Sequence, residues 1–411
     1  MPSSITLIAG HGLNKISSLL ALDKMKIAII DITGRNPTQY NPSLCHAISK
    51  QVSEVKVTLC SPTLTGAADG YDWLKLLSLL PPKMAFSSET GLSNIILRGI
   101  ESILNYVYIS IWALSRKPDI IHFQWLPFVE YSRMDRLFLG LLHALSPQSK
   151  VFLTVHNVYP HRLQDNQKAN YRKRFDMLKK YIAGYLVHLE SSKHEFAKEF
   201  GINENMITVA YHGIYNHNKT AISKRLIDDG FIHVIMYGIQ SRYKGADILM
   251  KALGLLPIQY QEIIRCSIIG RTDPLLFEEC HEDAERLNVD WENQFVSDDY
   301  LFDAIEKSDL ILLPYRAISQ SGVLLLALSY KKPILTSNLP SFKETLDGYP
   351  DSYFFESNNP QSLANKLVEF VDGKIDKVRM CKVIERLNDK YSWDETAKRT
   401  LEAYGVLAVF E

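Results

Sequence analysis

Short β-branched runs alternate with helical patterns along most of this sequence. The runs expected to form strands are 26–32, 55–60, 119–125 and 150–156 in the first half, and 232–238, 265–270, 309–315 and 332–337 in the second. A long helical pattern, 94–116, separates two of the early runs. Such alternation is typical of parallel α/β sheets, in which helices connect the strands. The expected fold class is therefore α/β.

The chain length favours more than one core. With 411 residues the chain exceeds the size at which a single hydrophobic core stops growing. A polar, turn-rich segment at 219–230 separates the two series of strands. We therefore expect a first domain at 25–218, a second at 230–390, and a closing helix at 391–411 that returns to the first domain.

Composition excludes several classes of protein. The formal net charge is zero, so nucleic acid is not an expected partner. Five scattered cysteines without a CxxC pair fit reduced thiols better than disulfides or a zinc site. No uninterrupted apolar run reaches the ~18 residues that span a bilayer, and the first 24 residues do not resemble a signal peptide. These features predict a cytoplasmic protein.

Two loops of the second half carry groups suited to an anion. Parallel sheets bind ligands beyond the carboxyl ends of their strands, where loops lead into helix N-termini. Arg242 and Lys244 lie in one such loop, and Ser321 and Gly322 precede an apolar helix. Cations and backbone N–H groups at a helix start are what a diphosphate needs.

Each of these features also has a simpler explanation. Loop cations are usually solvated and contribute little to folding, and Ser-Gly before a helix is usually an N-cap. Ser-x-x-Glu spacing, which predicts a capping box, occurs three times, at Ser192/Glu195, Ser341/Glu344 and Ser392/Glu395.

The order of the motifs resembles that of a known family. The strings "YGIQSRYKG", "CSIIGR" and "SQSGVLLLALSYKKPILTSNLPSFKE", together with "HFQW" and "LTVHNVYPH" in the first half, resemble retaining GT-B glycosyltransferases of family 4. The resemblance covers nearly the whole chain from Met25. It implies two Rossmann-like domains that face each other across a cleft, and transfer of a sugar from a nucleotide-sugar to a glycan or lipid-linked acceptor, with retention of the anomeric configuration.

The resemblance also implies roles for individual residues. Those implied to bind the donor are Arg242, Lys244, Ser319, Gln320, Ser321, Gly322, Phe295, Val296 and Glu344. His156 matches the histidine that faces the family's cleft, although it could instead only tie off a strand end. Arg35 and Tyr40 lie in the loop where such enzymes meet the acceptor.

One departure from the family concerns two glutamates. Ile318 and Leu326 stand where family 4 members usually carry this pair, eight positions apart. Apolar side chains cannot bind the ribose or the sugar. This departure keeps a catalytically silent relative open as an alternative, one that binds a nucleotide-sugar or a partner glycosyltransferase. An epimerase of the same fold is a third class.

Two further expectations concern metal and membrane. No Asp-x-Asp occurs in the sequence, so no cofactor is expected and cations would replace a divalent metal. The apolar segment 94–116, with Arg98 and Arg116, could rest on the inner face of a membrane that carries a lipid-linked acceptor. Alternatively it is a buried helix of the first domain.

Overall fold

A computed structural model describes residues 24–33, 39–64, 66–80, 92–160, 163–214, 229–318 and 320–406. Its contacts divide the chain into two compact units. One comprises Met1–Val155, Arg162–Leu186 and Thr400–Glu411, and the other His156–His161 and Val187–Arg399. The predicted boundaries 25–218, 230–390 and 391–411 stay a prediction, and the polar segment 219–230 lies outside the described residues up to position 228.

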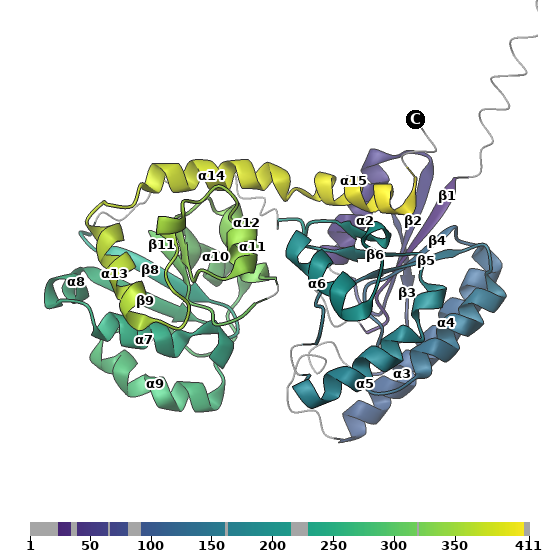
Figure 1. The fold of residues 1–411 in the computed structure, drawn as a ribbon, viewed down its shortest axis with the longest axis horizontal. Helices are drawn as coiled ribbons and strands as arrows, with labels where there is room; N and C mark the ends of the chain where they lie inside the picture. Colours follow the sequence, from purple (N-terminus) through teal and green to yellow (C-terminus); the bar gives the residue numbers. More distant parts are fainter. Residues whose placement is uncertain are drawn as a thin grey trace, which may run out of the picture. The chain divides into compact units, whose positions relative to one another are not determined.

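The first half of the chain forms a seven-stranded sheet in the order β3-β2-β1-β4-β5-β6-β7 (Figure 1). Its strands are β1 (Met25–Ile30), β2 (Val55–Ser61), β3 (Asp72–Lys75), β4 (Ile120–Phe123), β5 (Lys150–Thr154), β6 (Gly184–Val187) and β7 (Ile207–Val209). The strand pairs from β3 through β6 are parallel, and Ile27, for instance, lies opposite Val57 on one side and Ile120 on the other. The helices between them are α2 (Tyr40–Gln51), α3 (Leu92–Arg116), α4 (Met134–Leu145), α5 (Asp165–Asp176) and α6 (Glu190–Phe200), with short 3₁₀ turns η2 (Lys179–Tyr181) and η3 (Glu204–Met206).

The second half forms a five-stranded parallel sheet in the order β10-β9-β8-β11-β12. Its strands are β8 (Ile232–Tyr237), β9 (Ile264–Ile269), β10 (Asp290–Glu292), β11 (Leu310–Leu313) and β12 (Ile334–Thr336). The connecting elements are η4 (Arg242–Lys244), α7 (Ala246–Gly254), α8 (Ile258–Ile263), α9 (Pro274–Arg286), α10 (Asp298–Lys307), α11 (Gly322–Ser329), α12 (Pro340–Thr345) and η5 (Asp351–Tyr353). Three helices follow, α13 (Pro360–Val371), α14 (Lys377–Lys390) and α15 (Trp393–Tyr404).

Burial explains why the second sheet forms where it does. All four residues of β11 are buried, as expected for a central parallel strand covered on both faces. Helices α7 and α9 lie side by side on one side of this sheet, and α11 and α14 lie on the other (Figure 1). The central strands β8 and β11 are thereby held rigidly, and the loops that follow them rest on this core.

The three expected capping boxes have different outcomes. Ser392 accepts a hydrogen bond from the backbone N of Glu395 at 3.2 Å, so this cap is confirmed. Helix α6 begins before Ser192, with Leu189 as N-cap, so no box forms there. Ser341 lies inside α12 and donates to the carbonyl of Ile318 instead. The box predicted for Ser341 and Glu344 is therefore wrong.

The alternative that α3 is a buried helix of the first domain is wrong, and its contact with a membrane stays a prediction. By length and composition, Ser93–Arg116 could cross a membrane, although only a third of it is buried. No uninterrupted apolar run of that length is present, since Arg98 and Glu101 interrupt this one, but the helix as a whole is long and apolar enough to be a candidate span. Tyr106, Ile109 and Ala113 are buried in the core, but the helix is not buried as a whole.

Candidate active site

Lys244 lies beside the point where the second sheet reverses its strand order. Strands β8 and β11 are neighbours, while the strands that follow each of them run outward to opposite edges. Parallel α/β sheets bind ligands at the carboxyl ends of such a pair. Here the loop after β8 carries η4 with Lys244, and the loop after β11 leads to Ser321 and α11. The structure therefore places both predicted anion-binding loops at the switch point of one sheet.

Lys244 is a buried cation. Its side chain lies with Nζ 5.6 Å from the centre of the Tyr315 ring, and the residue is only 7% exposed. Burial lowers the pKa of Lys244 to about 8. A charge in such a position costs folding free energy unless an anion compensates it. The expectation that Lys244 is a solvated loop lysine is wrong.

Two glycines bring the Lys244 loop close to the sheet. Gly238 directly follows β8 with φ +87°, and a Cβ there would lie 3.2 Å from both Lys244 Nζ and Val323 Cγ2. Gly245 has φ +79°, and a Cβ there would lie 2.0 Å from the carbonyl oxygen of Pro314. Only glycine allows this approach, so the loop, the end of β11 and the first turn of α11 converge.

The start of α11 is open. Ser321 caps the helix, since its Oγ accepts a hydrogen bond from the Leu324 backbone N at 3.1 Å. The Leu325 N–H bonds the Ser321 carbonyl, which leaves the first-turn N–H groups of Gly322 and Val323 for a ligand. Among the residues that the structure describes, no atom lies within 4 Å of a Cβ placed on Gly322. The N-cap explanation is therefore confirmed, and it is compatible with an anion at the same turn.

Arg316 is a residue that sequence reasoning did not assign to the site. Its guanidinium donates to both carboxylate oxygens of Asp247 at 2.8 and 2.6 Å, and to the Arg242 carbonyl at 2.7 Å. Burial opposes ionisation of Asp247, but Arg316 holds the pKa of Asp247 below its usual value. This pair locks η4 to the loop after β11. Asp247, an acidic residue in the first turn of α7, is the sequence feature that could have indicated a basic partner in a neighbouring loop.

Arg242 is held differently from Lys244. Its guanidinium pairs with the carboxylate of Glu279 on α9, and a second carboxylate, Asp247, lies 3.8 Å away. The side chain is 56% exposed. Binding of a diphosphate by Arg242 would require exchange of the Glu279 partner, so Lys244 is the stronger candidate.

The remaining candidates in this region for binding the donor are Ser319, Gln320, Phe295 and Val296. Ser319 lies outside the described residues, and Gln320 is half-buried immediately before the cap. Phe295 is 87% exposed after the edge strand β10, whereas Val296 packs partly against the core. Their predicted role at a nucleobase stays a prediction.

Glu344 makes hydrogen bonds that the sequence did not suggest. Within the second unit, its carboxylate accepts from the backbone N–H groups of Glu190 and Ser191, at 2.5 and 3.1 Å, in the first turn of α6. Acceptors at a helix N-terminus are favoured by its unpaired donors and dipole. Glu344 thus caps a different helix from its own, and its donor-binding role stays a prediction.

His156 belongs to a chain of histidines. His188 Nδ1 lies 2.8 Å from the Ala210 carbonyl, which can only accept, so this nitrogen carries the proton. Burial lowers the pKa of His188 to about 4, so the ring is neutral and its Nε2 accepts. The partner of that Nε2 is His156 Nδ1, at 3.1 Å. His156 Nδ1 therefore donates this hydrogen bond, and in a neutral ring the Nε2 atom, which is buried, keeps its lone pair.

The acceptor candidates stand as follows. Arg35 lies outside the described residues. Tyr40 begins α2 and is 2% exposed, so its ring is not presented to a large acceptor. Asp31, directly after β1, accepts hydrogen bonds from the Thr33 backbone N and from Asn41 Nδ2, both at 3.2 Å. Among the described residues, no group of three His, Cys, Asp or Glu side chains could hold a metal ion.

Comparison with known proteins identifies the class of this fold. Residues 232–372 match the family model described as Glycosyl transferases group 1. The chain is 21% identical over 302 residues to D-inositol 3-phosphate glycosyltransferase of Paenarthrobacter aurescens, which covers 70% of this chain and 72% of that protein.

Solved structures agree on the architecture. Anabaena HepE in complex with UDP-glucose matches with a TM-score of 0.63 at 14% identity, over 94% of this chain and 100% of that chain. The lipopolysaccharide outer core galactosyltransferase WaaB matches with a TM-score of 0.59 at 16% identity, over 92% and 99%. The predicted GT-B fold is confirmed, and residues 232–372 are similar to glycosyl transferases of group 1.

Proposed function

We propose that this chain is a glycosyltransferase that moves a sugar from a nucleotide-sugar to a glycan or lipid-linked acceptor, with retention of configuration. The observation that carries the proposal is the buried Lys244 beside the open first turn of α11. As the donor bond breaks, negative charge grows on the leaving diphosphate. A fixed ammonium and oriented N–H groups stabilise that charge most as it forms.

The relatives suggest the donor and the setting. HepE binds UDP and UDP-glucose, and WaaB acts on the lipopolysaccharide outer core. A uridine diphosphate sugar is therefore the first donor to test, and surface polysaccharide or glycoconjugate synthesis at the cytoplasmic side of a membrane is the proposed setting. We further propose that transfer needs no divalent metal, because Lys244 and the α11 amides meet the diphosphate charge.

His156 is the proposed catalytic residue. Its Nδ1 proton is fixed by His188, so Nε2 can accept a hydrogen bond or a proton. A histidine nitrogen of this kind can accept a proton from a sugar hydroxyl group.

The alternative is a catalytically silent relative, and one observation favours it. Ile318 and Leu326 are both partly buried against the core of the second unit, so neither position supplies a carboxylate. Such a protein would bind the nucleotide but transfer nothing.

The deciding experiment is calorimetric titration with UDP and a panel of UDP-sugars, followed by product analysis with a glycan acceptor in excess EDTA. Binding together with a new glycoside that keeps the donor's anomeric configuration by NMR supports the enzyme. Binding without any product supports the silent relative. Activity restored only by Mg²⁺ would refute metal independence, and an inverted product would refute retention.

A further inference from the structure

Helix α3 exposes a continuous apolar stripe. Side chains at helical spacing along its outer face reach solvent, among them Ile100, Leu104, Val107, Ile111 and Leu114, with Ile111 58% exposed. Helix α4, which packs beside α3 (Figure 1), exposes Leu137 and Leu141. A monomeric soluble protein rarely exposes so many neighbouring large apolar side chains, and such patches mark docking surfaces. We call the outward side chains of α3 and α4 the α3–α4 face.

The opposite side of α3 is fixed to its own unit. Asn105 is fully buried, and its amide bonds both the N–H and the carbonyl of Leu77, at 2.8 and 3.0 Å. Tyr106 donates to buried Asp135 at 2.8 Å. Crossing a bilayer would strip these groups of their partners, which is costly in hydrocarbon. Although α3 is long enough to span, these contacts favour an orientation in which it stays packed on its own unit.

The charges of the α3–α4 face have one sign. Helices α3 and α4 contain five acidic or arginine side chains, and the two acidic ones, Glu101 and Asp135, are buried. Those that reach solvent are Arg98, Arg116 and Arg136. A second copy of this chain on the same face would bring arginines together without a carboxylate from these helices to balance them. An anionic surface is the complementary partner.

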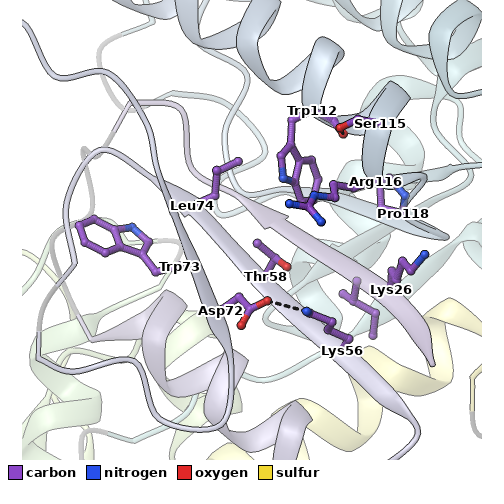
Figure 2. A pocket seen from close by; sticks show the side chains of 11 residues that line it. Lys26, Lys56, Thr58, Asp72, Trp73, Leu74, Trp112, Ser115, Arg116 and Pro118 are labelled. Carbon is purple, nitrogen blue, oxygen red and sulfur yellow. Dashed lines mark hydrogen bonds and ion pairs between the residues drawn. The ribbon is translucent and has the colours of Figure 1, made fainter. Parts of the chain in front are cut away.

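A cavity at the end of α3 is also lined by more basic than acidic side chains. It has a volume of 490 Å³ and is lined by Trp112 and Arg116 from α3, by Lys26 and Lys56 from the strands, and by Asp72 (Figure 2). Asp72 is its single acidic residue and pairs with Lys56 at 3.0 Å. The lining therefore keeps a positive excess next to tryptophan, a residue that prefers the headgroup level of a membrane.

We propose that the α3–α4 face docks in-plane on an anionic lipid bilayer, with apolar side chains at the acyl boundary and the cavity of Arg116 at headgroup level. An amphipathic helix binds membranes in this manner through apolar burial plus attraction to acidic lipids. The inference adds a surface and a lipid class to the proposed function, and it does not depend on catalysis.

Vesicle flotation tests the apolar part. Wild-type protein should float with vesicles of phosphatidylcholine and phosphatidylglycerol in equal parts, and far less with phosphatidylcholine alone. Leu104→Glu with Ile111→Glu should weaken binding more than about tenfold. The matched control is Leu275→Glu with Val378→Glu, two exposed positions of the second unit, which should bind as wild type. Circular dichroism checks that both variants fold, and UDP titration checks the donor site separately.

A second arm tests the charge. Arg116→Gln with Arg136→Gln should lower binding to the phosphatidylglycerol vesicles about tenfold or more, since each basic residue near an acidic surface contributes about 1 kcal/mol. Equal flotation of the glutamate variant and its control would overturn the proposal. A wild-type dimer that the glutamate variant converts to monomers, with no vesicle binding by either, would overturn it in favour of a second copy.

Discussion

Lys244 extends so close to the end of β8 that a Cβ on Gly238 would lie 3.2 Å from its Nζ. Gly238→Ala should therefore displace the ammonium as well as strain a backbone at φ +87°. We expect a loss of roughly 1–2 kcal/mol in stability from the strain and weaker UDP binding by calorimetry. Gly373→Ala is the control, because φ is +71° there and no atom lies within 4 Å. Equal UDP affinity in both variants would show that Gly238 does not position Lys244.

Lys244→Met should change stability and binding in opposite directions. Removing an uncompensated buried charge should raise the free energy of unfolding of the free protein by about 1–3 kcal/mol. Loss of the ammonium should weaken nucleoside diphosphate binding by roughly 1.5–3 kcal/mol. Thermal unfolding and titration with UDP measure the two effects. A variant that loses both stability and affinity would indicate that the lysine acts through packing.

Diphosphate affinity should fall as pH rises through about 8, where Lys244 of the free protein loses its proton. Below that pH the ammonium is present and binding is strongest; above it, binding requires proton uptake, so affinity drops up to about tenfold per pH unit. The free protein should behave oppositely, because between about 8 and 10.5 the native state holds fewer protons than the unfolded chain and stability rises with pH. Titration in buffers of different ionisation enthalpy detects the uptake. Lys244→Met should show no such pH dependence.

The sequence predicted most of the interior strands, but of the four edge strands only β12. Each of the eight expected strands is present within two or three residues of its limits. Strands β3, β6, β7 and β10 were missed. Three of them lie at sheet edges, where short segments such as Asp290–Glu292 lack an apolar pattern, and β6 (Gly184–Val187) is an interior strand of only four residues. Lys244 was assigned to the right loop, but its burial depends on Gly238 and Tyr315, which are distant in sequence. Likewise, the contact of Glu344 with α6 joins residues 154 positions apart.

His188 should act as a positioning residue for His156. His188→Phe removes the acceptor that fixes the His156 tautomer, so kcat should fall by less than about 100-fold, the lower bound for losing an acid–base group itself. His188→Gln should restore much of the rate, because an amide can accept from His156 Nδ1 and donate to Ala210. The KM for the donor should stay unchanged, and the pH profile of kcat should shift only in the phenylalanine variant. A lower kcat with the same profile in both variants would indicate a structural role.

Substitutions at Ser321 can distinguish the role of a helix cap from that of a ligand site. Ser321→Ala should lose the bond from Leu324 and about 0.5–2 kcal/mol of stability, as any N-cap would. Asp376→Ala, at the N-cap of α14, is the control for that loss alone. Ser321→Trp should fill the space in front of the Gly322 and Val323 N–H groups, where no described residue has an atom within 4 Å of a Cβ on Gly322. If these groups hold the diphosphate, the tryptophan variant should stay folded and lose both UDP binding and transfer.

Because Ile318 and Leu326 leave the ribose and sugar without carboxylates, uridine should bind far more weakly than UDP. Wild-type transfer by the tryptophan variant, or equal binding of uridine and UDP, would remove the first turn of α11 from the site.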